Sequence, residues 1–370
     1  MIIIQSITKK YKIRDSNLEL LRIISMFFIV LHHYAYHGSF IWTQQYNKLF
    51  WNSDKIYLFL SCLGKAAVVA FVMIGAWFLS EKEFKIWRVI QLCMTTFIYS
   101  WLIFLFLRWK FPSLINVESM NNIWWPIPIP SNYWFVIAYV YMLLFMPFMN
   151  LIIKKTTKRQ IIIIIIVFTI LWTTIQFIPN KKLDNDNYNF FDFNNYFLLI
   201  YVIAGYLRKY KPKWSKGFFK SLCILILSIL VILVTIYNIP NKDYSFFAVL
   251  MASLSNPFSL ILGIALFVFF NNVHLGHSIV INYVSKSMFG VYLIHDNSFV
   301  RTILWHKVIN TLPYAQSPLK YLKYGLIVSV IIFITCIIID IIKRLTIDPI
   351  FNYLGLKCTN KIRTWSNKAS

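Results

Sequence analysis

NLELLRIISMFFIVLHHY, at residues 17–34, decides the fold class, because it is the first of many segments apolar enough to cross a bilayer as a helix. It also carries Glu19, Arg22, His32 and His33. Ionisable side chains are costly in hydrocarbon, so they persist mainly where they face a polar cavity, a partner or a substrate. Arg22 and His33 are eleven residues apart. At about 100° per residue they share one helix face and lie about 16 Å apart along the axis. The segment therefore predicts a membrane helix with a functional face.

The composition of the whole chain is that of a membrane protein. Hydrophobic residues make up 59% and aromatic residues 18%, and the mean hydropathy is +0.63, which excludes an ordinary soluble domain. We predict an all-α integral membrane protein with about ten transmembrane helices. These are expected at about residues 18–37, 57–80, 87–108, 132–153, 160–178, 194–208, 218–238, 246–270, 284–303 and 322–343. The sixth is short, and the ninth is interrupted by His295 and Asp296.

The net charge of +24 is explained by topology rather than by nucleic-acid binding. With both termini in the cytoplasm, the predicted inner segments hold most of the lysines and arginines, as the positive-inside rule requires. We accordingly predict a cytoplasmic N-terminal tail at 1–17, a membrane domain at 18–343 and a cytoplasmic C-terminal tail at 344–370. The inner charges also favour contact with anionic membrane lipids. No nucleic-acid partner is expected.

Several short motifs follow one another in a recognisable order. They are Glu19-Leu-Leu-Arg22 with ten residues between Arg22 and His33, the stretch 68–75, Lys85-Ile-Trp-Arg88, residues 132–135 with Pro147 and Asn150, residues 201–208 and residues 292–295. Together they resemble membrane acyltransferase family three, bacterial multi-pass proteins that move acyl groups, usually acetyl, onto cell-surface carbohydrates. The resemblance covers about residues 17–343, with Ile74 standing where the family usually has a serine. It implies an O-acyltransferase of the bacterial cell membrane that uses acetyl-CoA or another acyl-CoA and a carbohydrate acceptor.

Acyl transfer to a hydroxyl needs a base, and His33 is the predicted one, because histidine titrates near neutrality. Arg22 is expected to grip the phosphates of the donor or to orient its thioester; the alternative is an arginine that pairs with Glu19 and reaches the interface. Lys85 and Arg88 are predicted to bind the phosphates of acyl-CoA. The positive-inside rule explains these two charges equally well.

The remaining ionisable residues of the spans carry weaker expectations. His295 is a supporting candidate, but it is not expected to act together with Asp296, because neighbours in a helix do not share a face. Lys65 is expected either to line the same cavity as His33 or to extend outward to the interface. His37 is expected at the water interface, with binding of the acceptor as the alternative. No metal site is predicted.

Some alternatives stay open at this stage. The acyl group passes to the hydroxyl either directly or through an acyl-histidine at His33, and succinyl or another acyl group is an alternative to acetyl. A surface glycan, a cell-wall polymer and a lipid-linked oligosaccharide all fit as acceptors. The main competing function is export of a polysaccharide or lipid-linked saccharide without acyl transfer. A polysaccharide polymerase ranks lowest, because the outer loops are short and weakly basic.

Overall fold

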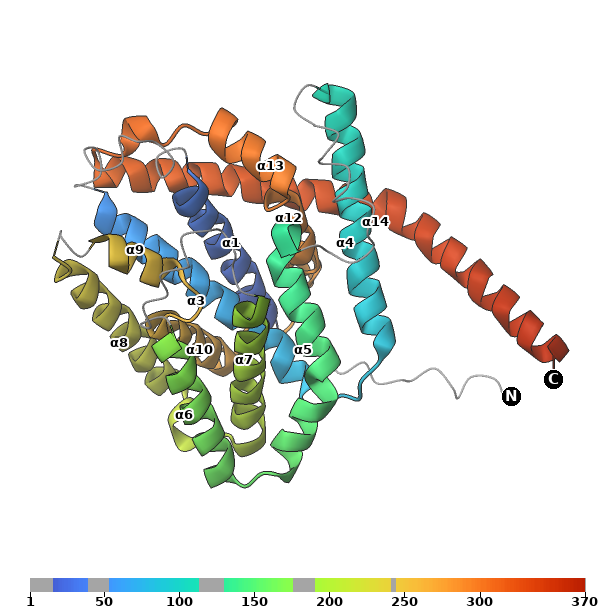
Figure 1. Ribbon diagram of the computed structural model, residues 1–370, viewed down its shortest axis with the longest axis horizontal. Coiled ribbons are helices and arrows are strands. Elements are labelled where there is room, and N and C mark those ends of the chain that lie inside the picture. The colour runs from blue at the N-terminus through green and yellow to red at the C-terminus, as the bar shows by residue number, and fades with distance from the viewer. Residues whose placement is uncertain (1–15, 39–52, 113–129, 176–189, 241–243, 370) are drawn as a thin grey trace.

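The computed structural model describes residues 16–38, 53–112, 130–175, 190–240 and 244–369, and these residues form an all-helical structure without strands (Figure 1). This confirms the all-α class. The α-helices are α1 (Asn17–His37), α3 (Asp54–Leu79), α4 (Ile86–Lys110), α5 (Pro130–Lys155), α6 (Lys158–Ile175), α7 (Phe190–Tyr210), α8 (Phe218–Tyr237), α9 (Tyr244–Ala252), α10 (Pro257–Asn272), α11 (Ile279–Val284), α12 (Met288–His295), α13 (Ser298–Ile303) and α14 (Pro318–Ala369). Short 3-10 or π turns lie at Lys213–Ser215, Ser285–Ser287, Leu304–Val308 and Leu312–Tyr314.

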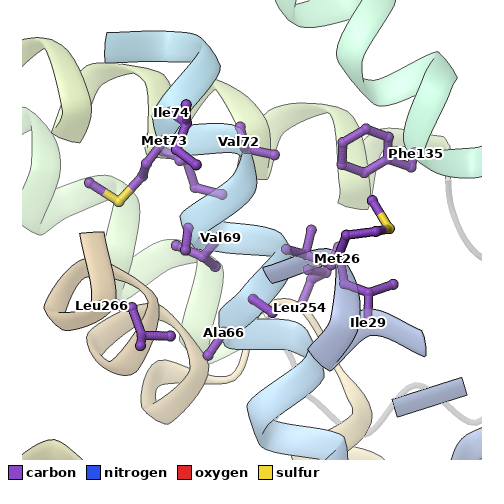
Figure 2. Close-up of a cluster of buried hydrophobic side chains, with 14 of the residues drawn as sticks. Met26, Ile29, Ala66, Val69, Val72, Met73, Ile74, Phe135, Leu254 and Leu266 are labelled. Carbon is purple, nitrogen blue, oxygen red and sulfur yellow. The ribbon is translucent and has the colours of Figure 1, made fainter. Parts of the chain in front are cut away.

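Helix α3 lies at the centre of the bundle, where it packs against α1, α7, α8, α9 and α10. Of its most apolar stretch 72% is buried, against 22% for α4 and for α8, which present most of that surface outward. Figure 2 shows α3 between α10, which contributes Leu266, and α1, which contributes Met26 and Ile29. The close approach of α1 depends on Gly64, because a Cβ there would lie 2.1 Å from Cβ of His32. This crossing fixes which residues of α3 face the functional stripe of α1.

Seven segments of the described chain are long and apolar enough to cross a membrane. They are α1, α3, α4, Tyr133–Lys155 within α5, α8, Phe246–Asn272 and Pro318–Pro349. They coincide with seven of the predicted spans. Helices α6 and α7 form where two further spans are predicted, although neither is among these seven. The total of ten and the cytoplasmic position of the termini stay predictions.

The predicted span at 284–303 is not a single helix. The chain forms α11, a 3-10 turn, α12 and α13 there, with a break after His295. Asn297 starts α13, because its side-chain oxygen accepts a hydrogen bond from the backbone N–H of Phe299 at 3.1 Å. Tyr133 holds the break in place by donating to the carbonyl of Leu293 and accepting from Nδ2 of Asn297, each at 2.8 Å. A capping residue inside an apolar run therefore ends the helix where a membrane span would continue.

A buried polar cluster attaches α12 to α14 at the end of α12 away from this break. Asp340 accepts a hydrogen bond from the hydroxyl of Tyr99 and pairs with Nε of Arg344 at 2.8 Å. Arg344 donates to Oγ of Ser287 at 2.8 Å. Helix α14 crosses the predicted domain boundary at 343 without a break. The cluster fixes the start of α12, and Tyr133 fixes its other end. The position of the whole helix is therefore defined.

Candidate active site

The centre of the site is a contact between two histidines from distant parts of the chain. Nδ1 of His33, on α1, lies 2.9 Å from Nε2 of His295, at the end of α12. Both residues are buried, at 7% and 0% exposure. Nδ1 of His295 in turn lies 2.6 Å from the carbonyl oxygen of Val291, one turn earlier in α12. The structure thus brings together two of the residues singled out from the sequence.

This chain of contacts assigns the proton positions of the neutral rings. A carbonyl oxygen only accepts hydrogen bonds, so Nδ1 of His295 carries the proton that faces Val291. Nε2 of the neutral His295 is then unprotonated and accepts from Nδ1–H of His33. The proton of the neutral His33 ring is therefore on Nδ1, and its Nε2 keeps a free lone pair. That nitrogen is a base or a nucleophile.

Asp296 approaches the same nitrogen of His33, at 3.8 Å from Nδ1 to Oδ1, and is itself 1% exposed. His295 and Asp296 therefore both approach His33, which neighbours in one continuous helix were not expected to do. They can do so because α12 ends at His295 and the backbone turns away from the helix at Asp296. Arg301 completes the group, with Nη1 at 3.4 Å from Oδ1 of Asp296. The carboxylate can therefore stabilise a positive charge on His33.

A small pocket adjoins these histidines. His33, His32 and Lys65 line it, so of the two alternatives left open for Lys65 the structure agrees with the shared cavity. The rest of the lining is apolar or aromatic: Met26, Ile29, Val68, Phe71, Trp134, Phe135, Phe289 and Tyr292. Figure 2 shows Met26 of α1 turned toward Phe135 of α5, with Ile29 near Met26 on the same helix. Such walls exclude water and strengthen the electrostatic effect of the few polar groups.

The other predicted site residues lie away from the pocket. Arg22 pairs with Glu19 through Nη1 and Oε2 at 2.9 Å, and its side chain is 25% exposed. Lys85 is exposed just before the first turn of α4, and Nη1 of Arg88 donates to the carbonyl of Glu83 at 2.6 Å. None of these four predicted residues is part of the pocket lining.

One group of residues has the composition of a metal site, although none was predicted. His33, His37 and Asp296 each offer a ligand atom, all within 4.8 Å of one another. Histidine and carboxylate are common zinc ligands. However, Arg301 already occupies Oδ1 of Asp296, and a second cation there would be repelled. His37 is only partly buried and its ring lies 5.1 Å from that of His33, at the outer edge of the site.

Motif spacing did not indicate that Asp296 and Arg301 belong to this site. Their signal in the sequence was only that charged residues interrupt an apolar run, which is a pointer to function in a membrane segment. Which partner each would meet depends on the break after α12.

Comparison with known proteins identifies a family. The model of a family described as an acyltransferase domain matches residues 15–343, nearly the whole chain. No curated protein and no solved structure shows a significant match.

Proposed function

The chain belongs to acyltransferase family 3, and from this premise we propose that it transfers an acyl group, expected to be acetyl, from a cytoplasmic acyl-CoA to a hydroxyl of an extracytoplasmic carbohydrate. The observation that carries the proposal is the hydrogen-bonded chain from Val291 through His295 to His33. It leaves one basic nitrogen, Nε2 of His33, beside a largely apolar pocket in a membrane helix.

In the proposed reaction, Nε2 of His33 takes the proton of the acceptor hydroxyl while the hydroxyl oxygen attacks the thioester carbon. The tetrahedral intermediate collapses, the C–S bond breaks, and the proton on His33 passes to the departing thiolate. The products are an O-acyl ester and free CoA. His295 holds the ring in the required tautomer, and Asp296 stabilises the imidazolium that forms, since its carboxylate lies 3.8 Å from Nδ1. In the alternative route the same nitrogen first accepts the acyl group itself.

The face of α1 between Arg22 and His33 supports a path for the donor. Met26 and Ile29 lie on this face, at helical spacing between the two polar residues, and both line the pocket. This apolar face, about 16 Å long, is proposed to guide the pantetheine arm of acyl-CoA, with its thioester at His33. Arg22 would then meet the polar end of the arm.

The phosphates of the donor are assigned to the basic residues at the start of α4. Lys85 and Arg88 follow the end of α3, and consecutive spans run in opposite directions, so this end lies on the same membrane side as Arg22. Both side chains are at least partly exposed, which leaves them accessible to a phosphate. The proposed setting is a bacterial cell membrane, where anionic lipids face the same basic surface.

The test uses inside-out and right-side-out vesicles that contain the wild-type protein, His33→Ala or His274→Ala. His274 is an exposed histidine and serves as the matched control. With radiolabelled acetyl-CoA on the cytoplasmic side, label is expected in membrane carbohydrate for the wild type and for His274→Ala, and none for His33→Ala.

Transfer by a folded His33→Ala protein would refute the mechanism. If no acyl-CoA donor gave label despite correct insertion and a supplied acceptor, saccharide export without acyl transfer would replace the proposed function.

A further inference from the structure

We propose that Lys65 is a second catalytic residue of this site and that its ammonium group stabilises the negative oxygen that forms on the acyl carbonyl. This inference rests on the proposed acyl transfer and adds a group that lies outside the sequence motifs quoted above. It assigns a function to a lysine placed deep in a membrane helix.

The position of Lys65 follows from the crossing of α1 and α3. Its neighbour Gly64 packs directly on His32, so Lys65 leaves α3 at the level of His32 and His33. It lines the same pocket as both histidines. Nζ of Lys65 lies 5.7 Å from the ring centre of Tyr36 and 5.6 Å from that of Trp134, so two aromatic rings hold the ammonium in place.

The charges around His33 leave the ammonium available for a substrate. Asp296 already pairs with Arg301 at 3.4 Å and approaches His33 at 3.8 Å. Among the described residues no ion pair joins Lys65 to a carboxylate. Holding an unpaired cation in an apolar pocket costs free energy, and an anion bound next to it offsets that cost. The reaction produces one such charge, next to Nε2 of His33.

The role is defined by the reaction step. When the hydroxyl oxygen bonds to the thioester carbon, the carbonyl π electrons move to the carbonyl oxygen, which becomes an oxyanion. The hydroxyl proton is then on His33, and the ammonium of Lys65 donates a hydrogen bond to the oxyanion. When the C–S bond breaks, the electrons return to the carbonyl and the proton leaves with the thiol. Lys65 keeps its proton throughout, so the step balances without a further reactant.

An acidic group on the acceptor is the competing ligand for Lys65. That ligand would change binding of the acceptor, whereas oxyanion stabilisation changes the rate of the chemical step for any acceptor, including water. The two explanations therefore predict different effects on kcat and KM.

The experiment compares full-length wild-type protein, Lys65→Met, Lys65→Arg and the control Lys55→Met in lipid nanodiscs. Lys55 lies on the same helix, is exposed, and contacts the carbonyl of Tyr237 at 3.0 Å. For Lys65→Met, kcat of transfer and of acetyl-CoA hydrolysis should fall about 10²- to 10³-fold, the loss typical of one oxyanion donor, with KM nearly unchanged. Lys65→Arg should keep part of the rate, and Lys55→Met all of it.

Two further measurements separate catalysis from structure. The thermal unfolding temperature of Lys65→Met should equal or exceed that of the wild type, because an apolar side chain replaces a charge in a largely apolar pocket. Lys65→Cys treated with 2-bromoethylamine, which rebuilds an ammonium side chain, should recover activity, whereas iodoacetamide should not restore it.

An unchanged kcat, or a rise confined to KM for acidic acceptors, would overturn the inference while His33→Ala still abolished transfer. Retained transfer in His33→Ala would instead overturn the proposed function itself.

Discussion

The contact between His33 and His295 can be tested by removing the acceptor and keeping the size of the side chain. In His295→Leu, Nδ1–H of His33 loses the nitrogen that lies 2.9 Å away. His33 donates that hydrogen bond, and its ring becomes cationic during the reaction. Hydrogen bonds of charged groups contribute about 1.5–3 kcal/mol. At about 1.4 kcal/mol for each factor of ten, kcat should fall about 10- to 150-fold.

The assay is acetyl transfer by purified protein in nanodiscs, with kcat and KM measured separately. KM for acetyl-CoA should change little, because His295 is not part of the pocket lining and acts through His33. His295→Gln is the matched variant, because its side-chain oxygen can still accept from Nδ1. It should retain more activity than His295→Leu. In a His33→Ala background, His295→Leu should have no further effect, because the bond it removes no longer exists.

Transfer by His295→Leu within twofold of the wild-type kcat would refute this reasoning. The free lone pair on Nε2 of His33 would then not depend on the chain of hydrogen bonds that begins at Val291. A rise in KM for acetyl-CoA with an unchanged kcat would also contradict a positioning role for His295.

Two further predictions concern the helix crossing and the donor path. In Gly64→Ala the new Cβ would lie 2.1 Å from Cβ of His32, so α1 and α3 must move apart. We expect the unfolding free energy, measured by thermal denaturation in detergent, to fall by about 1–3 kcal/mol. Unchanged stability would contradict the close contact. Arg22→Gln should raise KM for acetyl-CoA about tenfold or more. Its effect should stay small when the donor is a short thioester without phosphates, such as S-acetyl-N-acetylcysteamine, and the acyl group is transferred to water. Equal losses with both donors would show that Arg22 does not meet the polar part of acyl-CoA.

The sequence predicted the helical class and the positions of most spans, because long apolar runs have few alternatives to membrane helices. It also singled out His33 and His295 separately. It did not predict their contact, since no spacing relates residues that are 262 positions apart. Lys65 shows the same limit: two orientations were open, and the choice between them depends on the contact of Gly64 with α1.

The interruption of the helix at 284–303 has a physical cause that bears on function. A continuous helix there would give a better membrane span, but it would turn His295 and Asp296 about 100° apart, and only one of them could approach His33. The break after His295 lets the ring of His295 and the carboxylate of Asp296 reach the same nitrogen, at 2.9 and 3.8 Å. Asn297 and Tyr133 compensate the interrupted backbone with hydrogen bonds, as an irregular segment within hydrocarbon requires. The feature that makes this segment a poor span is therefore the one that assembles the site, and an apolar run interrupted by paired ionisable residues and a capping asparagine favours a broken helix over a continuous one.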